Sequence, residues 1–242
     1  MTRKGTPLIV MAQSLLEKGL SNQNGATMST VRIPRQQRSM QTKSRIMKAA
    51  FQLFARKGIH GTNSKEIVEK AGVSIGSFYS YFKNKKTLLL EMLEEFLDRV
   101  YLTIWKQVDS HMVREFGRED IKVIIENVFK AYAISPEFMR QTHALRYSDP
   151  DIKRLFDRER SKEVAQIQYV IETNADRLRA KDPYAAAIVI HNAVECVAHS
   201  ASFLGPKIDE SRLIDELTDM IYNYVFREAE AKNEIGHRPT RT

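Results

Sequence analysis

The sequence predicts an all-α fold, and three observations support this prediction. Apolar residues recur at intervals of three and four over most of the chain, which is the spacing of a helix face. Helix start and stop signals separate these segments, among them Asp149-Pro150, Asp182-Pro183 and Gly205-Pro206. No stretch alternates polar and apolar residues as a half-buried strand does, and no repeat recurs at a fixed period. We therefore expect helices packed without a sheet.

Composition indicates a globular protein with a sizeable core, because the chain has 242 residues of which 43% are hydrophobic. The single cysteine, Cys196, excludes an intrachain disulfide and a cysteine-rich zinc module. The apolar run Leu8–Met11 is too short for a membrane span and lacks the small-residue cleavage site of a signal peptide. We expect a cytoplasmic protein with no membrane partner.

Charge is unevenly distributed along the chain. Residues 1–90 contain 16 Lys and Arg but only three acidic residues, so this part carries +13 and the remainder −5. Such a cationic segment favours a surface that meets polyphosphate. The basic residues from Arg32 to Lys48 can lie along DNA phosphates or act only as a solubilising arm. We expect residues 1–40 to form a flexible basic arm.

The most informative stretch runs from Thr62 to Phe82. Thr62 or Asn63 can cap a first helix, and Gly72 supplies the tight turn that follows it. Ser74 can cap a second helix about three residues later. Two short helices joined in this way form a helix-turn-helix, the motif that places its second helix in the major groove of DNA.

The flanking segments extend this pattern into a protein of many helices. One helix braces the motif, and a long helix leads out of it into a second domain. The expected helices cover residues 42–57, 85–111, 120–133, 136–147, 151–179, 184–204 and 209–231. We expect a DNA-binding domain at residues 41–87, a larger helical domain at 88–232 and a flexible tail at 233–242.

The run FQLFARKGIHGTNSKEIVEKAGVSIGSFYSYFKNKKTLL resembles the DNA-binding domain of the tetracycline repressor (TetR) family. Its landmarks are Lys57-Gly58 after the first helix, Ala71-Gly72-Val73 in the turn, and the aromatic run Phe78–Phe82 before Lys83-Asn84-Lys85. The resemblance implies a homodimeric transcription regulator, a repressor that leaves a palindromic double-stranded operator when a small-molecule effector binds. It also implies that the long helix after the motif transmits ligand binding.

By the same resemblance, both helices of the motif contact DNA. The implied contacts are Ser64, Lys65, Ile75, Gly76, Ser77, Tyr79, Ser80 and Tyr81, with Lys85 on a phosphate. The second helix has no Arg, Asn or Gln for bidentate base reading, so Lys65 is the strongest candidate for that role.

Aromatic and polar side chains lie in the segments that form the ligand pocket of the TetR family. The candidate effector contacts are Trp105, Phe129, Tyr132, Met139, His143, Arg146, Tyr147 and Tyr169. Aromatic residues at helical spacing can also be simple core. Arg140, His143 and Arg146 would suit an anionic effector.

The two C-terminal helices are the most apolar pair in the sequence, and in the TetR family this pair meets its copy in a four-helix dimer interface. The candidate interface residues are Ile188, Leu213, Leu217, Met220, Ile221 and Tyr224.

Other chemistry has little support in the sequence. His191, Glu195 and His199 lie on one helix stripe, but three ligands along a straight helix span about 12 Å at 1.5 Å per residue, so a hydrogen-bonding stripe is the better reading and we expect no metal and no cofactor. No nucleophile elbow, phosphate loop or metalloprotease motif occurs, so we expect no enzyme. The alternative function is a DNA-binding architectural or division-associated protein without an effector.

Overall fold

The computed structural model describes residues 35–105, 108, 110–205 and 208–227, and most of these residues lie in α-helices. The helices are α2 (Arg35–Lys57), α3 (Ser64–Ala71), α4 (Ile75–Tyr81), α5 (Lys85–Trp105), α6 (Ser110–Arg114), α7 (Arg118–Ala133), α8 (Pro136–Leu145), α9 (Pro150–Thr173), α10 (Pro183–Leu204) and α11 (Glu210–Val225). Over the described range only an isolated bridge, Leu178 to Phe226, has β-type pairing. The predicted all-α fold is therefore confirmed.

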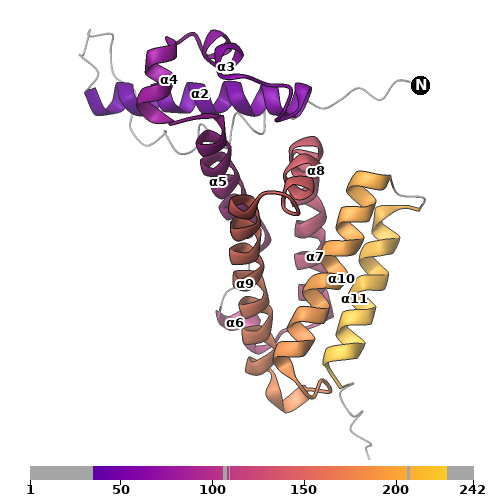
Figure 1. Ribbon diagram of the computed structural model, residues 1–242. Coiled ribbons are helices and arrows are strands. Elements are labelled where there is room, and N and C mark those ends of the chain that lie inside the picture. The colour runs from indigo at the N-terminus through magenta and orange to yellow at the C-terminus, as the bar shows by residue number, and fades with distance from the viewer. Residues whose placement is uncertain (1–34, 106–107, 109, 206–207, 228–242) are drawn as a thin grey trace, which may run out of the picture.

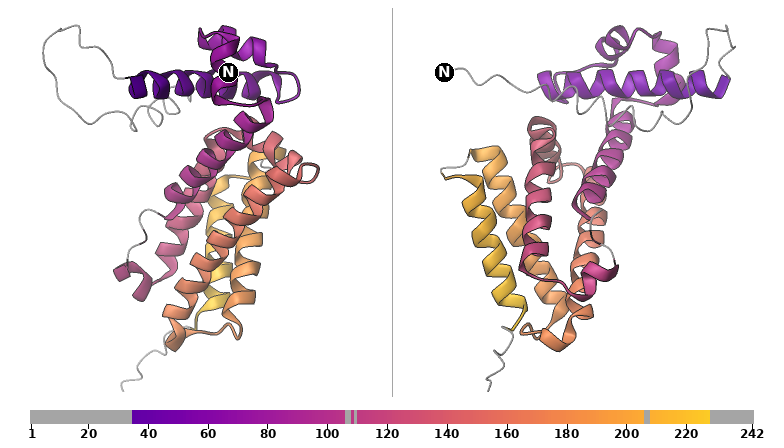
Figure 2. Two further views of the ribbon diagram at one scale, coloured as in Figure 1. Left: turned by 60° about the vertical axis from the view of Figure 1, so that its left-hand side comes forward. Right: turned by 180° about the vertical axis from the view of Figure 1, so that it is seen from behind.

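The first three helices form a small domain at one end of the molecule (Figure 1). α2 lies crosswise to the long helices, and α3 and α4 pack on it through Ile46, Phe54, Ile67 and Phe78, all fully buried. α5 leads from this domain into the second one, as Figure 2 shows from two further sides. Its apolar stripe, which includes Leu93, is buried against the bundle.

The larger domain is a bundle in which α7 contacts α5, α10 and α11, and α9 contacts α5 and α10. An aromatic cluster closes the joint between the two domains: Phe138 of α8 lies 5.0 Å from Phe51 of α2 and 5.5 Å from Phe96 of α5, measured between ring centroids. The Lys86 ammonium adds ion pairs of 2.8 Å to Asp149 and 2.6 Å to Asp151 at the turn between α8 and α9. The hydrogen bond from Lys86 lowers the pKa of Asp149. The start of α5 is thus held to the bundle.

Several helix ends differ from the sequence prediction. α2 begins at Arg35, so the last residues of the expected flexible arm are helical, while residues 1–34 and the tail 233–242 lie outside the described range. The long helix ends at Trp105 rather than at the expected residue 111, and the Val108 N–H bonds to the Trp105 carbonyl.

The helices α9 and α11 also end earlier than predicted, and each end has a local cause. The helix that begins at Pro150 stops at Thr173 because the buried Asn174 amide donates to the carbonyls of Val113 and Val170, at 2.7 and 2.9 Å. α11 ends at Val225 because Phe226 turns into extended backbone and bridges to Leu178.

Candidate nucleic-acid interface and ligand cavity

The helix-turn-helix is closed by its own side chains. The Asn63 side chain accepts from the Glu66 N–H at 3.0 Å, and the Glu66 carboxylate accepts from the Asn63 N–H, which completes a capping box. Gly72 ends α3 with φ of +63°, a left-handed conformation that suits glycine. Ser74 accepts from the Ser77 N–H at 3.1 Å and starts α4. These caps confirm the predicted turn and orient α4 rigidly.

The side chains on the outer face of α4 are exposed rather than packed in the core. Tyr79 is 58% exposed and Ile75 is 43% exposed, whereas Phe78 on the opposite face is fully buried. Of the implied DNA contacts, Lys65, Ile75, Gly76, Tyr79 and Ser80 are exposed, and Ser64, Ser77, Tyr81 and Lys85 are half-buried. The side chains of Ile75 and Tyr79 on this face are therefore accessible to a bound partner.

Besides the implied phosphate contact, Lys85 also makes hydrogen bonds within the small domain. Its ammonium donates to the carbonyls of Ile59 and Thr62, both at 2.7 Å, and so fastens the loop before α3. An ammonium has three N–H donors, so one stays available for a phosphate. Tyr81 is also engaged, because its hydroxyl lies 3.0 Å from the Ser39 hydroxyl of α2.

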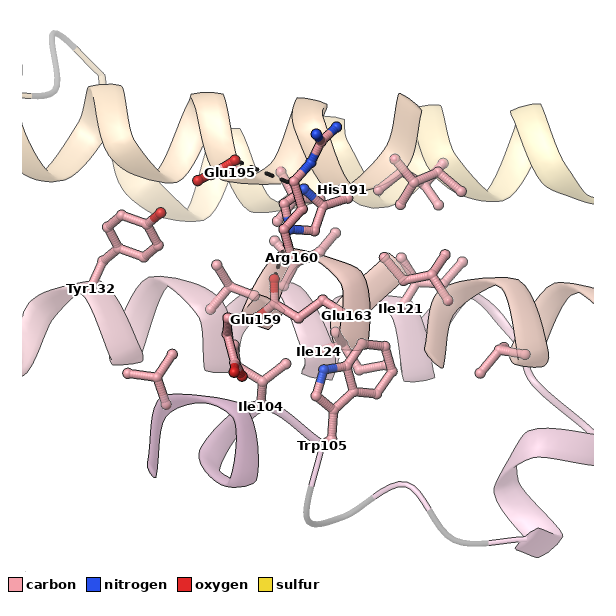
Figure 3. A pocket seen from close by; sticks show the side chains of 18 of the residues that line it. Ile104, Trp105, Ile121, Ile124, Tyr132, Glu159, Arg160, Glu163, His191 and Glu195 are labelled. Carbon is pink, nitrogen blue, oxygen red and sulfur yellow. Dashed lines mark hydrogen bonds and ion pairs between the residues drawn. The ribbon is translucent and has the colours of Figure 1, made fainter. Parts of the chain in front are cut away.

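A cavity of about 140 Å³ lies inside the larger domain, between α5, α7, α8, α9, α10 and α11. Most of its wall is aliphatic and aromatic. A belt of polar side chains crosses it, formed by His143, Arg146, Glu159, Arg160, Glu163, His191 and Glu195. Figure 3 shows Ile104 and Trp105 on one side of the cavity, His191 and Glu195 on the other, and Glu159 and Glu163 between them. A mostly apolar pocket with few convergent polar groups is the usual form of a small-molecule site.

The structure brings five of the eight candidate effector contacts to this cavity. The five that line it are Trp105, Tyr132, Met139, His143 and Arg146. Phe129 is buried in the core without lining the cavity, and Tyr147 and Tyr169 are 87% and 54% exposed. Tyr147 instead borders a separate polar hollow next to Arg146. Contrary to the prediction, Phe129, Tyr147 and Tyr169 therefore do not line this cavity.

The polar belt contains more carboxylates than the sequence analysis noticed. Glu163 lies 2.7 Å from the His191 Nε2, and the Arg146 guanidinium donates to Glu195 at 3.2 Å. The His191 and Glu195 stripe is thus a hydrogen-bonding stripe, and no group of three possible metal ligands occurs among the described residues. Glu159 and Glu163 belong to the same inward face of α9 as Phe156 and Ile167, at helical spacing. That spacing is the signal that could have identified them.

Burial determines the protonation of the belt. Desolvation lowers the pKa of His143 to about 4, so its imidazole is uncharged at neutral pH. Desolvation likewise raises the pKa of Glu159, although the hydrogen bond from Lys162 opposes this. The pKa of the Tyr132 phenol is also raised, mainly by burial. The cavity is therefore a site of low polarity in which each charge is costly.

Gln141, which was not among the predicted site residues, connects α8 to the small domain. Its Oε1 accepts from the Ile59 N–H at 2.9 Å, and its Nε2 donates to the Phe54 carbonyl at 3.2 Å. Met139 and His143, which flank it in α8, line the cavity. One short helix therefore touches both the cavity and the end of α2.

The free face of α10 and α11 is apolar, but its residues differ from those predicted. Leu217 and Ile221 are only 6% and 5% exposed and lie in the interior of the chain, so they cannot form a partner surface. Leu213 and Ile188 are half-buried, and Met220 and Tyr224 are 49% and 42% exposed. The helix face was misassigned because α11 is apolar on more than one side.

α10 is the most apolar of these helices. Tyr184, Val189 and Leu204 on its outer side are all more than half exposed. Among the described residues it is the one helix whose length and composition would allow a membrane crossing, and 28% of its apolar window is buried.

Comparison with known proteins agrees with the geometry of the small domain. Residues 46–92 match the sequence profile of the bacterial regulatory proteins of the tetR family. The uncharacterized HTH-type transcriptional regulator YuxN of Bacillus subtilis is 34% identical over 86 residues, which are 35% of this chain and 30% of that protein. The matches to the first three curated relatives span 30–48% of the length of those proteins.

Solved structures extend the likeness to the larger domain as a likeness of fold. A tetR-family transcriptional regulator from Mesorhizobium loti superposes with a TM-score of 0.64 at 22% identity, over 78% of this chain and 99% of that one. A transcriptional regulator from Saccharomonospora viridis in complex with choline gives 0.65 at 18% identity, over 78% and 100% of the two chains. The capped helix-turn-helix and the matched segment agree with each other: residues 46–92 of this chain are similar to the DNA-binding part of the tetR family of bacterial regulatory proteins.

Proposed function

We propose that this protein is a cytoplasmic transcription regulator, a repressor that binds a palindromic DNA operator as a homodimer and releases it when a small molecule enters the cavity. The observation that carries the proposal is the outer face of α4, where Tyr79 and Ile75 are exposed on a helix capped at its start. Hydroxyls and apolar side chains at this position can reach phosphates and thymine methyl groups in a major groove.

The homodimer follows from the free face of α10 and α11. Tyr184, Val189, Met220 and Tyr224 expose apolar area that water solvates poorly. A second copy, related by a two-fold axis, would cover this face and set two α4 helices roughly 34–36 Å apart, one turn of DNA.

Release of DNA follows from the position of α8. A ligand that pushes on Met139 or His143 displaces the helix whose Gln141 bonds to Ile59 and Phe54 at the end of α2. Because α5 is held to the same bundle, the two recognition helices of a dimer would change their spacing.

The DNA part is tested by selecting bound duplexes from genomic fragments and measuring affinity against salt. The slope of log affinity on log salt should be near −0.9 per phosphate contacted. Lys65→Ala and Tyr79→Ala should change preference at particular base pairs, whereas Lys153→Ala, on the distant α9, should change nothing. A flat salt response with no selected sequence contradicts the proposal.

The dimer is tested by placing charge on the free face. Tyr224→Glu should give a monomer in light scattering and abolish operator binding, although no DNA-facing residue has changed. Tyr169→Glu, at an exposed tyrosine of α9 outside this face, is the matched control and should remain dimeric. A dimer that survives Tyr224→Glu and Met220→Glu together would refute this interface.

The effector response is tested without knowing the effector. Val128 of α7 lines the cavity, so Val128→Phe should act as a built-in ligand and lower operator affinity at least tenfold. Adding Gln141→Ala should restore part of that affinity. Leu102→Phe, on the exposed side of α5, adds the same ring outside the cavity and should have no effect. Normal operator binding by a folded Val128→Phe would favour the architectural, effector-free alternative.

A further inference from the structure

Four buried polar atoms of the larger domain have no hydrogen-bond partner within the described part of the chain: Trp105 Nε1, His143 Nε2, Glu159 Oε1 and His191 Nδ1. All four residues line the same cavity. An orphaned buried donor or acceptor costs the full desolvation of that group, so four of them in one place are not a random defect of packing. Together they are free hydrogen-bonding positions for a molecule bound in this cavity.

The carboxylate of Glu159 favours a ligand that carries a positive charge. The residue is 5% exposed, and its Oε2 lies 3.0 Å from the Lys162 ammonium. The same ammonium is 2.9 Å from Asp98, so two carboxylates share one cation. The second oxygen of Glu159 is left without a donor. Desolvation raises the pKa of this carboxyl group, and a cation at Oε1 would relieve that penalty.

The basic groups of the cavity have partners. Arg146 bonds to Glu195 and lies over the Phe156 ring, 5.4 Å from its centroid. Arg160 donates to the Asn192 side chain at 3.0 Å. An anionic ligand would have to separate Arg146 from Glu195 and bring its charge toward Glu159 and Glu163 as well. Arg140 pairs with Glu137 on the surface. The structure therefore disfavours the anionic effector that Arg140 and Arg146 suggested.

The size and wall of the cavity limit the rest of the molecule. A cavity of about 140 Å³ is close to the roughly 150 Å³ that holds one benzene ring. Most of the wall is apolar, with Val100, Ile104 and Ile125 among its residues. The Trp105 indole N–H remains an unused donor, which a hydroxyl or carbonyl oxygen on the ligand could accept.

We propose that the cavity binds a compact, mostly apolar amine in its protonated form, with its ammonium N–H donated to Glu159 Oε1. The proposal rests on the effector role of the cavity given above and names the class of effector. Charge-assisted hydrogen bonds are stronger than neutral ones, so selectivity for the cation over a neutral molecule of equal shape should be large.

The experiment compares benzylamine, benzyl alcohol and benzoate, which share one ring and differ in the charge of the head group. Trp105 is the one tryptophan of the chain and lines the cavity, so its fluorescence reports binding directly. We expect protonated benzylamine to bind at least tenfold more tightly than benzyl alcohol, and benzoate to bind most weakly. Equal binding, a preference for benzoate, or no binding of any of the three would overturn the proposal.

Glu159→Gln should remove the preference for the amine and retain binding of the alcohol, because the amide keeps the shape and loses the charge. Asp98→Asn is the matched control, since Asp98 shares Lys162 but is half exposed on α5 outside the cavity. It should keep the preference. Loss of selectivity in both variants would assign it to general electrostatics and overturn the role of Glu159.

Operator release by benzylamine is measured separately, in a DNA-binding assay with the wild-type protein. Amine selectivity in fluorescence without DNA release supports the cavity assignment and contradicts the proposed effector response. Normal operator binding combined with a preference for benzoate contradicts the amine proposal and leaves the proposed regulator intact. The two failures are therefore distinguishable.

Discussion

The two domains differ in whether the described buried side chains all have hydrogen-bond partners. In the small domain nearby side chains close the backbone ends: Asn63 caps α3, Ser74 caps α4, and Lys85 bonds two loop carbonyls. In the larger domain Glu159 and His143 face a cavity and keep unpartnered atoms. Every buried side-chain atom described in the first region has a partner, whereas four in the second have none and are offered to the ligand proposed above.

This difference suits the two proposed tasks. A surface that reads DNA must be held rigidly before the encounter, because side chains that move lose affinity on being ordered. A cavity that senses a molecule must gain something on binding that the empty state lacks, because a ligand shifts an equilibrium only by its differential affinity. Rigid caps serve the first requirement and orphaned polar atoms serve the second.

The largest effect should come from the core of the small domain. Phe78 is fully buried behind α4 and touches the Phe82 ring at 5.8 Å between centroids. Phe78→Ala should cost roughly 3–5 kcal/mol and abolish operator binding. Calorimetry should show an early transition for the small domain and an unchanged one for the bundle. Tyr79→Ala, at the exposed neighbour, should weaken DNA binding without this loss of stability. If both transitions shift together in Phe78→Ala, the domains are not independent.

The second largest effect is the loss of folding stability at acidic pH. Folding favours the neutral form of His143, whose pKa falls to about 4 on burial, so its contribution is fully present above the unfolded pKa of about 6.5 and is lost as pH falls toward 4. The limit of that loss is about 3 kcal/mol. The unfolding free energy of His143→Leu should therefore change less than that of the wild type between pH 6.5 and 4.

The control for this measurement is His60→Leu, which removes an exposed histidine of the small domain. Denaturant titrations at several pH values compare the three proteins. Equal slopes for wild type and His143→Leu would mean that the burial of His143 in the cavity does not make the unfolding free energy depend on pH.

The comparison also explains what could be predicted from the sequence. Asn63, Gly72 and Ser74 act on residues next to them, so their roles follow from local spacing, and both motif helices were predicted correctly. Gln141 acts on Ile59, 82 residues away, and no local pattern announces such a pair. Leu217 was assigned to the wrong side of α11 because a helix that is apolar on several faces does not reveal which one is covered.

A change of opposite sign is expected in the cavity. Glu159→Met replaces an orphaned buried carboxylate by an apolar chain of similar length, and Lys162 keeps Asp98 at 2.9 Å as its partner. The variant should be more stable by about 1–3 kcal/mol, since removal of an unsatisfied buried group is favourable. Denaturant unfolding measures this, and Glu163→Met, which breaks the bond to His191, should be destabilised. A destabilised Glu159→Met would show that Glu159 is satisfied in the empty protein.

The smallest effect is expected from removing a helix cap in the small domain. Asn63 accepts from the Glu66 N–H and donates its own N–H to the Glu66 side chain, so Asn63→Ala leaves the first turn of α3 with an open donor. Loss of a helix cap costs about 1 kcal/mol. Thermal unfolding of the small domain should therefore begin slightly earlier, and operator affinity should fall only modestly because α4 has its own cap at Ser74. Asn63→Ser keeps a capping oxygen and should behave as the wild type does. If Asn63→Ala is neutral, the closed hydrogen bonding of the small domain contributes nothing to its stability, and the contrast with the cavity rests on the orphaned atoms alone.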